Sequence, residues 1–137
     1  MGQVKEIIRL LTSMLDDSDD NVRDLVIENL NYAILFIPPD PIIMKADEAM
    51  NLKNLLKKLI DIYLEKSTQN ADSETNSKDN IDLLLKSLGS IRPQDIEQIM
   101  RELIEFGNSK STDFLNLCSE IITHCDLIKQ FKNFNLS

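Results

Sequence analysis

The sequence predicts an all-α protein, a single domain of residues 1–137 built from three stacked antiparallel helical hairpins, about six helices in all. Among 137 residues, 20 Leu and 17 Ile outnumber 3 Val, and there are 3 Gly and no Trp. This composition favours helices, because Val and the aromatic residues are the usual strand fillers. Apolar residues recur at the three- and four-residue spacing of amphipathic helices. The hairpin centres are about 40 residues apart, which is a repeat period typical of stacked helical hairpins.

The first hairpin is expected over residues 4–36. Its first helix has apolar residues at positions 4, 7, 8, 11, 14 and 15, and an acidic run at 16–20 interrupts the pattern. A second stripe follows, made of Val22, Leu25, Val26, Leu30, Ala33 and Ile34. This helix must end near the IPPDP segment at 37–41, because proline lacks an amide donor and favours extended backbone in the residue before it.

The second hairpin is expected over residues 46–89. One helix covers about 46–66, and the segment STQNADSETNSK at 67–78 is polar enough to form a flexible loop. The next helix covers about 79–88. Gly89 then suits a left-handed helix cap.

The third hairpin is expected over residues 93–127. Pro93 is tolerated in a first helical turn, and that helix runs to Phe106 before Gly107 ends it. Ser111 can cap the last helix, which continues through Cys125. The tail at 128–137 either adds a turn or frays.

The first hairpin resembles a HEAT repeat over residues 7–34. The segment IIRLLTSMLDDSDDNVRDLVIENLNYAI has a Leu-rich helix, an Asp-containing turn and then Asp-x-x-Val-Arg, with Asp19, Val22 and Arg23 on the positions of that motif. The resemblance implies a structural role for these three residues in the turn and between neighbouring repeats. It also implies a stack of hairpins that presents a surface to partner macromolecules. Hairpins two and three lack the motif and share only the helical layout.

The run DSDDNVRDLVIE also has the oxygen-ligand spacing of a calcium-binding loop that begins at Asp17. Two features argue against calcium. Val22 replaces the glycine that such a loop needs at its sixth place, and the apolar helical stripe already begins there. Asp19 is therefore expected to cap the second helix, with Asp20 and Asp24 near the positive end of the helix dipole.

The sequence offers little for metal, cofactor or catalytic chemistry. Cys118 and Cys125 share one helical face, but His124 is the single histidine and points about 100° away, so zinc is not expected. Both cysteines are expected to be buried, reduced thiols, because seven helical residues place their α-carbons too far apart for a disulfide. There is no glycine-flanked serine elbow and no phosphate-binding glycine loop, so the sequence predicts no enzyme.

The net charge of −8 is concentrated at the N-terminal end, where residues 1–40 carry three bases and eight acids. Nucleic acid is therefore disfavoured as the main partner. No apolar stretch is long enough to cross a membrane and no signal-peptide core is present, which suggests a soluble, cytoplasmic protein. The candidate partner-binding residues are the acids of the first hairpin and the bases of the third helix: Asp20, Asp24, Glu28, Lys53, Lys57 and Lys58.

These observations favour a non-enzymatic protein–protein interaction module or small scaffold, whose acidic first hairpin or inter-helical groove binds another protein. Two alternatives remain open. A nucleic-acid-associated helical repeat would use the basic face of the third helix, and a self-assembling oligomer, such as a homodimer, would use the end faces of a short stack.

Overall fold

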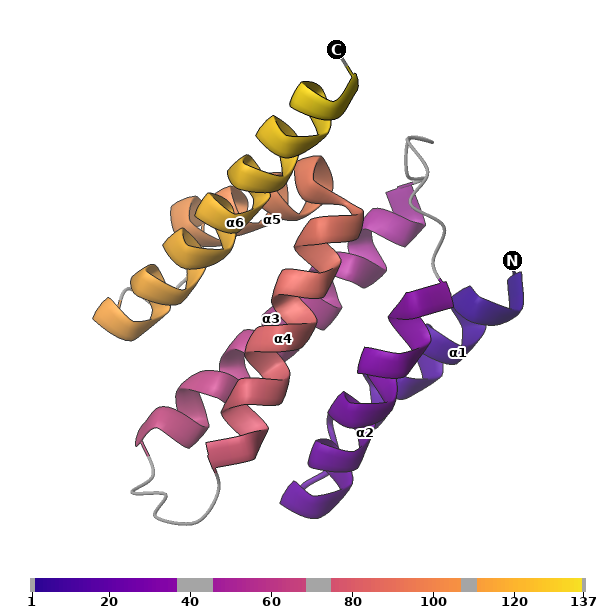
Figure 1. The fold of residues 1–137 in the computed structure, drawn as a ribbon. Coiled ribbons are helices and arrows are strands. Elements are labelled where there is room, and N and C mark those ends of the chain that lie inside the picture. The colour runs from indigo at the N-terminus through magenta and orange to yellow at the C-terminus, as the bar shows by residue number, and fades with distance from the viewer. Residues whose placement is uncertain (1, 37–45, 69–74, 107–110, 137) are drawn as a thin grey trace. The chain divides into compact units, whose positions relative to one another are not determined.

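The computed structural model describes residues 2–36, 46–68, 75–106 and 111–136. The fold is all-α, with six α-helices and no strand within these ranges (Figure 1). The predicted fold class is therefore confirmed. The chain divides into two compact units, residues 1–84 and 85–137, and the boundary falls inside one helix. The expectation of a single domain stays a prediction.

The first hairpin of unit 1 consists of α1 (Gly2–Met14) and α2 (Asp20–Ala33), followed by a short 3₁₀ helix, η1 (Ile34–Phe36). The two helices lie side by side and antiparallel (Figure 1). The inward face of α2 and η1 places Val26, Ile27, Leu30 and Ile34 in the core. The IPPDP segment lies outside the described residues, and η1 is the last described element before it.

Unit 1 continues with α3 (Ala46–Thr68) and the first part of α4 (Thr75–Ile91). The core-facing residues of these segments follow the predicted helical spacing. They are Leu55, Leu56, Leu59, Ile60, Ile62, Ile81 and Leu84. The start of α4 lies beside the end of α3, because the Lys78 ammonium lies 5.0 Å from the centre of the Tyr63 ring.

The predicted polar loop at 67–78 is wrong in its extent. Residues 67 and 68 belong to α3 and residues 75–78 to α4, while 69–74 lie outside the described residues. A polar composition is compatible with a helical turn when tertiary contacts hold that turn. Here the cation–π contact of Lys78, and the hydrogen bond that the Asn80 carbonyl accepts from Asn31 at 3.2 Å, hold the first turns of α4.

Unit 2 contains the rest of α4, then α5 (Pro93–Phe106) and α6 (Thr112–Leu136). The predicted Ser111 cap is confirmed, because its hydroxyl accepts a hydrogen bond from the Phe114 amide at 3.2 Å. The tail forms helix through residue 136, so α6 extends well beyond the expected end at 127. The core side chains of unit 2 come from all three helices and include Leu88, Ile96, Met100, Leu103, Phe114, Cys118, Ile121 and Cys125.

The predicted left-handed cap at Gly89 is wrong. Helix α4 continues through this residue to Ile91, and no described glycine has a positive φ. A Cβ atom at Gly89 would lie 3.1 Å from the Sγ of Cys125 and 3.4 Å from the Cδ2 of His124. The glycine therefore allows α4 and α6 to approach each other closely.

Candidate interaction surfaces

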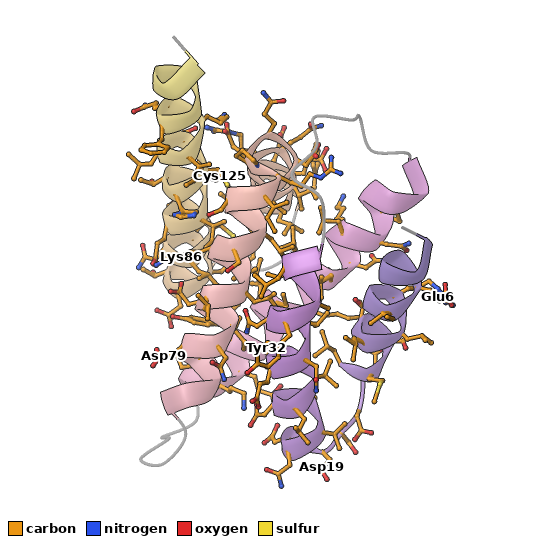
Figure 2. All side chains as sticks on the ribbon, turned by 45° about the vertical axis from the view of Figure 1, so that its right-hand side comes forward. Glu6, Asp19, Tyr32, Asp79, Lys86 and Cys125 are labelled. Carbon is orange, nitrogen blue, oxygen red and sulfur yellow. The ribbon has the colours of Figure 1, made fainter. Side chains whose placement is uncertain are left out.

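The acidic turn of the first hairpin is built around the start of α2. The Asp19 carboxylate accepts a hydrogen bond from the Asn21 amide at 2.9 Å, which confirms the predicted N-cap. The Asp17 carboxylate in turn accepts one from the Asp19 amide at 2.8 Å. Because residues 20–28 are helical, the twelve-residue run does not form a calcium-binding loop. Figure 2 shows Asp19 at the beginning of α2, with Tyr32 further along the same helix.

Three ion pairs join this turn and the first part of α2 to α3. Asp16 accepts from Lys58 at 2.9 Å, and the Arg23 guanidinium lies 3.5 Å from Glu65. Arg23 also pairs with Asp20 one turn earlier in α2. The third pair, between Asp24 and Lys66, spans 3.3 Å.

The Asp24–Lys66 pair is the most buried of the three, because only 8% of the Lys66 surface is exposed. Its position between α2 and α3 assigns Asp24 a structural contact inside unit 1. Replacing one partner of a buried ion pair leaves the other charge without compensation, which is more costly than losing an exposed pair. A lysine at position 24 would place two ammonium groups together. Asp24 is therefore a poor residue for probing partner binding.

The candidate bases of the third helix lie on α3, with Lys57 exposed and Lys53 and Lys58 half-buried. Lys58 is held by Asp16, as described above. The pKa of Asp61 is raised, because partial burial of its carboxyl outweighs the lowering effect of the Lys57 charge. Two predicted charged surfaces, the acidic turn and the basic helix, thus meet each other through the Asp16–Lys58 pair.

A different surface lies on the opposite side of α2 from the core. Leu25 and Tyr32 are 59% and 62% exposed, and the exposed Glu28 lies between them. The spacing of three and four residues puts these side chains in one row along the helix. We call Leu25, Glu28 and Tyr32 the α2 outer stripe. Leu35, in η1, is a further exposed apolar side chain shortly after Tyr32.

Glu28 is one of the predicted partner-binding residues, whereas Leu25 was expected in the core-facing stripe and Tyr32 was not among the candidates. The angles between side chains around the helix axis could have identified this exposed row. Successive residues of a helix turn by about 100°, so the buried Val26, Ile27 and Leu30 lie within an arc of about 100°, and Leu25 lies outside that arc. Val26 shares its face with the buried Ile27 and Leu30, and the seven-residue spacing from Leu25 to Tyr32 marks a second row.

Helix α1 carries a second exposed apolar row. Ile7, Leu10 and Met14 are about half exposed, at 50%, 51% and 48%. We call these residues the α1 outer stripe. Beside it, Glu6 and Arg9 form an ion pair within α1. The sequence placed Ile7 and Met14 on the apolar face with Leu11 and Leu15, but Leu11 is half-buried and Leu15, just after α1, is buried, so part of this face is exposed.

Polar contacts join helices within unit 2, and two of them involve side chains that could take part in chemistry. The Ser90 hydroxyl lies 2.9 Å from the Nε2 of His124 and 3.0 Å from the Lys86 carbonyl one turn earlier. A serine hydroxyl has one hydrogen to donate, and donation to that carbonyl leaves it as an acceptor from the imidazole. This arrangement suits a helix-to-helix hydrogen bond between α4 and α6. It does not suit a nucleophile, which must give its proton to the base.

The second polar contact is centred on Glu97 of α5. Lys129 of α6 donates to the Glu97 carboxylate, and Arg101 donates to it at 3.0 Å. The hydrogen bond from Lys129 is the main reason that the pKa of Glu97 is lowered to about 2. These groups join α5 to α6 as an ion-pair cluster.

The remaining candidate chemistry concerns the cysteines. Cys118 and Cys125 are free thiols with no exposed surface, and burial raises the pKa of each to about 11. The expectation of buried, reduced thiols is confirmed. Among the side chains that the structure describes, no group of three His, Cys, Asp or Glu residues is arranged to hold a metal ion. None of the helices in the described ranges is long and apolar enough to cross a membrane.

Comparison of this chain with known protein families, with curated proteins and with solved structures found no match.

Proposed function

We propose that this protein is a non-enzymatic protein–protein interaction module of the HEAT-like helical scaffold type, and that it binds its partner through the α2 outer stripe. The observation that carries the proposal is the exposure of Leu25 and Tyr32 in one row on the face of α2 that the core does not use. Exposed aromatic and aliphatic side chains that are grouped on one face are typical of protein-binding sites.

The distribution of charge supports the same surface. Asp16, Asp20 and Asp24 form ion pairs with bases of the same chain. Part of the acidic charge near the N-terminus is therefore used in contacts within the folded chain. A docking partner would have to disrupt these pairs to use those carboxylates. Binding at the α2 outer stripe requires no such loss.

The chain offers a matched test of this proposal. We expect the double variant Leu25→Ser, Tyr32→Ser to keep the far-ultraviolet circular dichroism of the wild type and to lose the proteins that tagged wild-type chain retains from an extract of its source cells. The control variant Leu127→Ser, Phe131→Ser changes two equally exposed apolar residues of α6 and should retain them. Equal retention by both double variants would contradict the proposal.

The α1 outer stripe favours a second candidate function, self-association. Ile7, Leu10 and Met14 form an apolar row, and the neighbouring Glu6–Arg9 pair is internally neutral, so two copies could pair along α1 without like-charge repulsion. Sedimentation velocity tests this directly. Self-association predicts a mass that rises with concentration above 15.7 kDa and a return to monomer in Leu10→Glu.

A further inference from the structure

We propose that the partner at the α2 outer stripe is a basic amphipathic helix from a different protein, with a Lys or Arg side chain that reaches Glu28 between two apolar contacts. The inference rests on the proposed function and adds the chemical class of the partner. Its evidence is the state of Glu28, the pairing of the chain's own bases, and the spacing of the stripe.

Glu28 differs from the acids around it. Within the described part of the chain, no hydrogen bond or ion pair holds its exposed carboxylate, whereas Asp20 pairs with Arg23 and Asp24 with Lys66. Its neighbours in the stripe, Leu25 and Tyr32, are large apolar groups. A partner that covers these two residues also removes water from the carboxylate. Such burial is unfavourable unless the partner supplies an opposite charge.

A second copy of this chain meets that requirement poorly, since it offers few bases besides the exposed Lys57. Most of the basic side chains that the structure describes lie in ion pairs with acids of the same chain. These bases are Arg9, Arg23, Lys58, Lys66, Lys86, Arg92, Arg101 and Lys129. Symmetric pairing of two α2 outer stripes would also bring the two Glu28 carboxylates towards each other, within a chain of net charge −8. The charge therefore points to a basic surface from another protein.

The spacing of the stripe points to a helical partner. Leu25 and Tyr32 are seven residues apart, which corresponds to about 10.5 Å along the axis of α2. A partner helix that lies along α2 presents its own apolar residues at the same interval, with positions three and four residues on lying between them. A base at one of these intermediate positions would lie opposite Glu28.

The experiment measures fluorescence anisotropy of designed peptides with purified wild-type chain in about 150 mM NaCl, where the screening length is about 8 Å. The first peptide, of about 18 residues, contains Leu at helical spacing and Lys elsewhere. The second replaces each Lys with Glu. The third has the composition of the first in an order that gives no apolar face, and reports attraction by charge alone.

The first peptide should bind the wild type, and the other two should bind at least about tenfold more weakly. Glu28→Lys should weaken the first peptide about fivefold or more and strengthen the second, because an exposed attraction becomes a repulsion. Glu105→Lys changes an exposed acid of α5 and should alter neither affinity by more than about twofold.

Three results would overturn the inference: no binding of the first peptide, equal binding of the first and third peptides, or equal effects of Glu28→Lys and Glu105→Lys. The proposed function is judged separately, by retention of cellular proteins in the Leu25→Ser, Tyr32→Ser variant. If that retention depends on the stripe while the peptides fail, the docking surface stands and the class of partner is wrong.

Discussion

Whether Gly89→Ala raises or lowers the free energy of unfolding depends on the close approach of α4 and α6. In the interior of an exposed helix, replacing Gly with Ala stabilises by about 0.5–1 kcal/mol. At Gly89 the new Cβ would lie 3.1 Å from the Cys125 Sγ, which is closer than an ordinary contact. Overpacking of this kind costs about 1–3 kcal/mol. We therefore expect Gly89→Ala to lower the free energy of unfolding by about 1 kcal/mol.

The cost of overpacking should exceed the gain from replacing glycine, because the Cys125 sulfur has little freedom to move. This side chain is fully buried, and the two helices are also joined nearby by the Lys86–Glu120 ion pair at 2.9 Å and the Ser90–His124 contact. In a Cys125→Ala background the sulfur is absent. The nearest remaining atoms to the new Cβ would be His124 Cδ2 at 3.4 Å and Ile96 Cγ2 at 4.0 Å, which are ordinary distances.

The sign of the Gly89→Ala effect should therefore reverse between the two backgrounds. We expect destabilisation in the wild type and stabilisation by about 0.5–1 kcal/mol in Cys125→Ala. Urea unfolding of the wild type, Gly89→Ala, Cys125→Ala and the double variant, monitored by circular dichroism, measures both effects. The m-value should be the same in all four proteins. If Gly89→Ala stabilises the wild type as much as it stabilises Cys125→Ala, the close approach of these helices is refuted.

Three further predictions concern the cap, an ion-pair cluster and the thiols. Asp19→Ala should lower the free energy of unfolding by about 1 kcal/mol and Asp19→Asn by much less, because asparagine also caps; equal losses would argue against the cap. Because Lys129 and its neighbours lower the pKa of Glu97 from 4.5 to about 2, their stabilisation is complete above pH 4.5 and is lost as the pH falls towards 2. Glu97→Gln should thus be less stable than the wild type at pH 7 and nearly equal at pH 2, and a constant difference in unfolding experiments would contradict this. Iodoacetamide at pH 8 should label Cys118 and Cys125 only in urea, since about one thiol in a thousand is ionised when the pKa is about 11; rapid labelling of the folded protein would contradict their burial.

The helices were predictable because their signals are local. Asp19 and Ser111 have short polar side chains that can accept from the first free amides of a helix, and each caps the helix that follows it. The buried Ile96, Ile99, Met100 and Leu103 of α5 likewise follow the three- and four-residue spacing that predicts an amphipathic helix. Gly89 shows the limit of local signals, because a glycine near the end of an apolar pattern fits a helix cap and a close helix contact equally well.

The surfaces could be predicted only in part, because exposure depends on which neighbours a helix receives. Helix α1 has apolar residues over a wide arc, and the sequence does not indicate that Ile7 and Met14 would lie at its exposed edge. The pairing of Asp16 with Lys58 depends on how α3 packs against the first hairpin. The sequence alone does not distinguish the acids and bases of unit 1 that are available to partners, whereas in the folded unit several of them neutralise one another.

The most direct test of the central claim places a photoreactive group in the α2 outer stripe. We would replace Tyr32 with p-benzoylphenylalanine, irradiate the purified chain in an extract of its source cells, and compare it with the same substitution at Phe131 of α6, which is similarly exposed. The proposal predicts a discrete adduct from position 32 that is lost when Leu25→Ser is added and that position 131 does not form. The same adducts from both positions, or an adduct from position 32 that Leu25→Ser leaves unchanged, would contradict the claim that this protein binds its partner through α2.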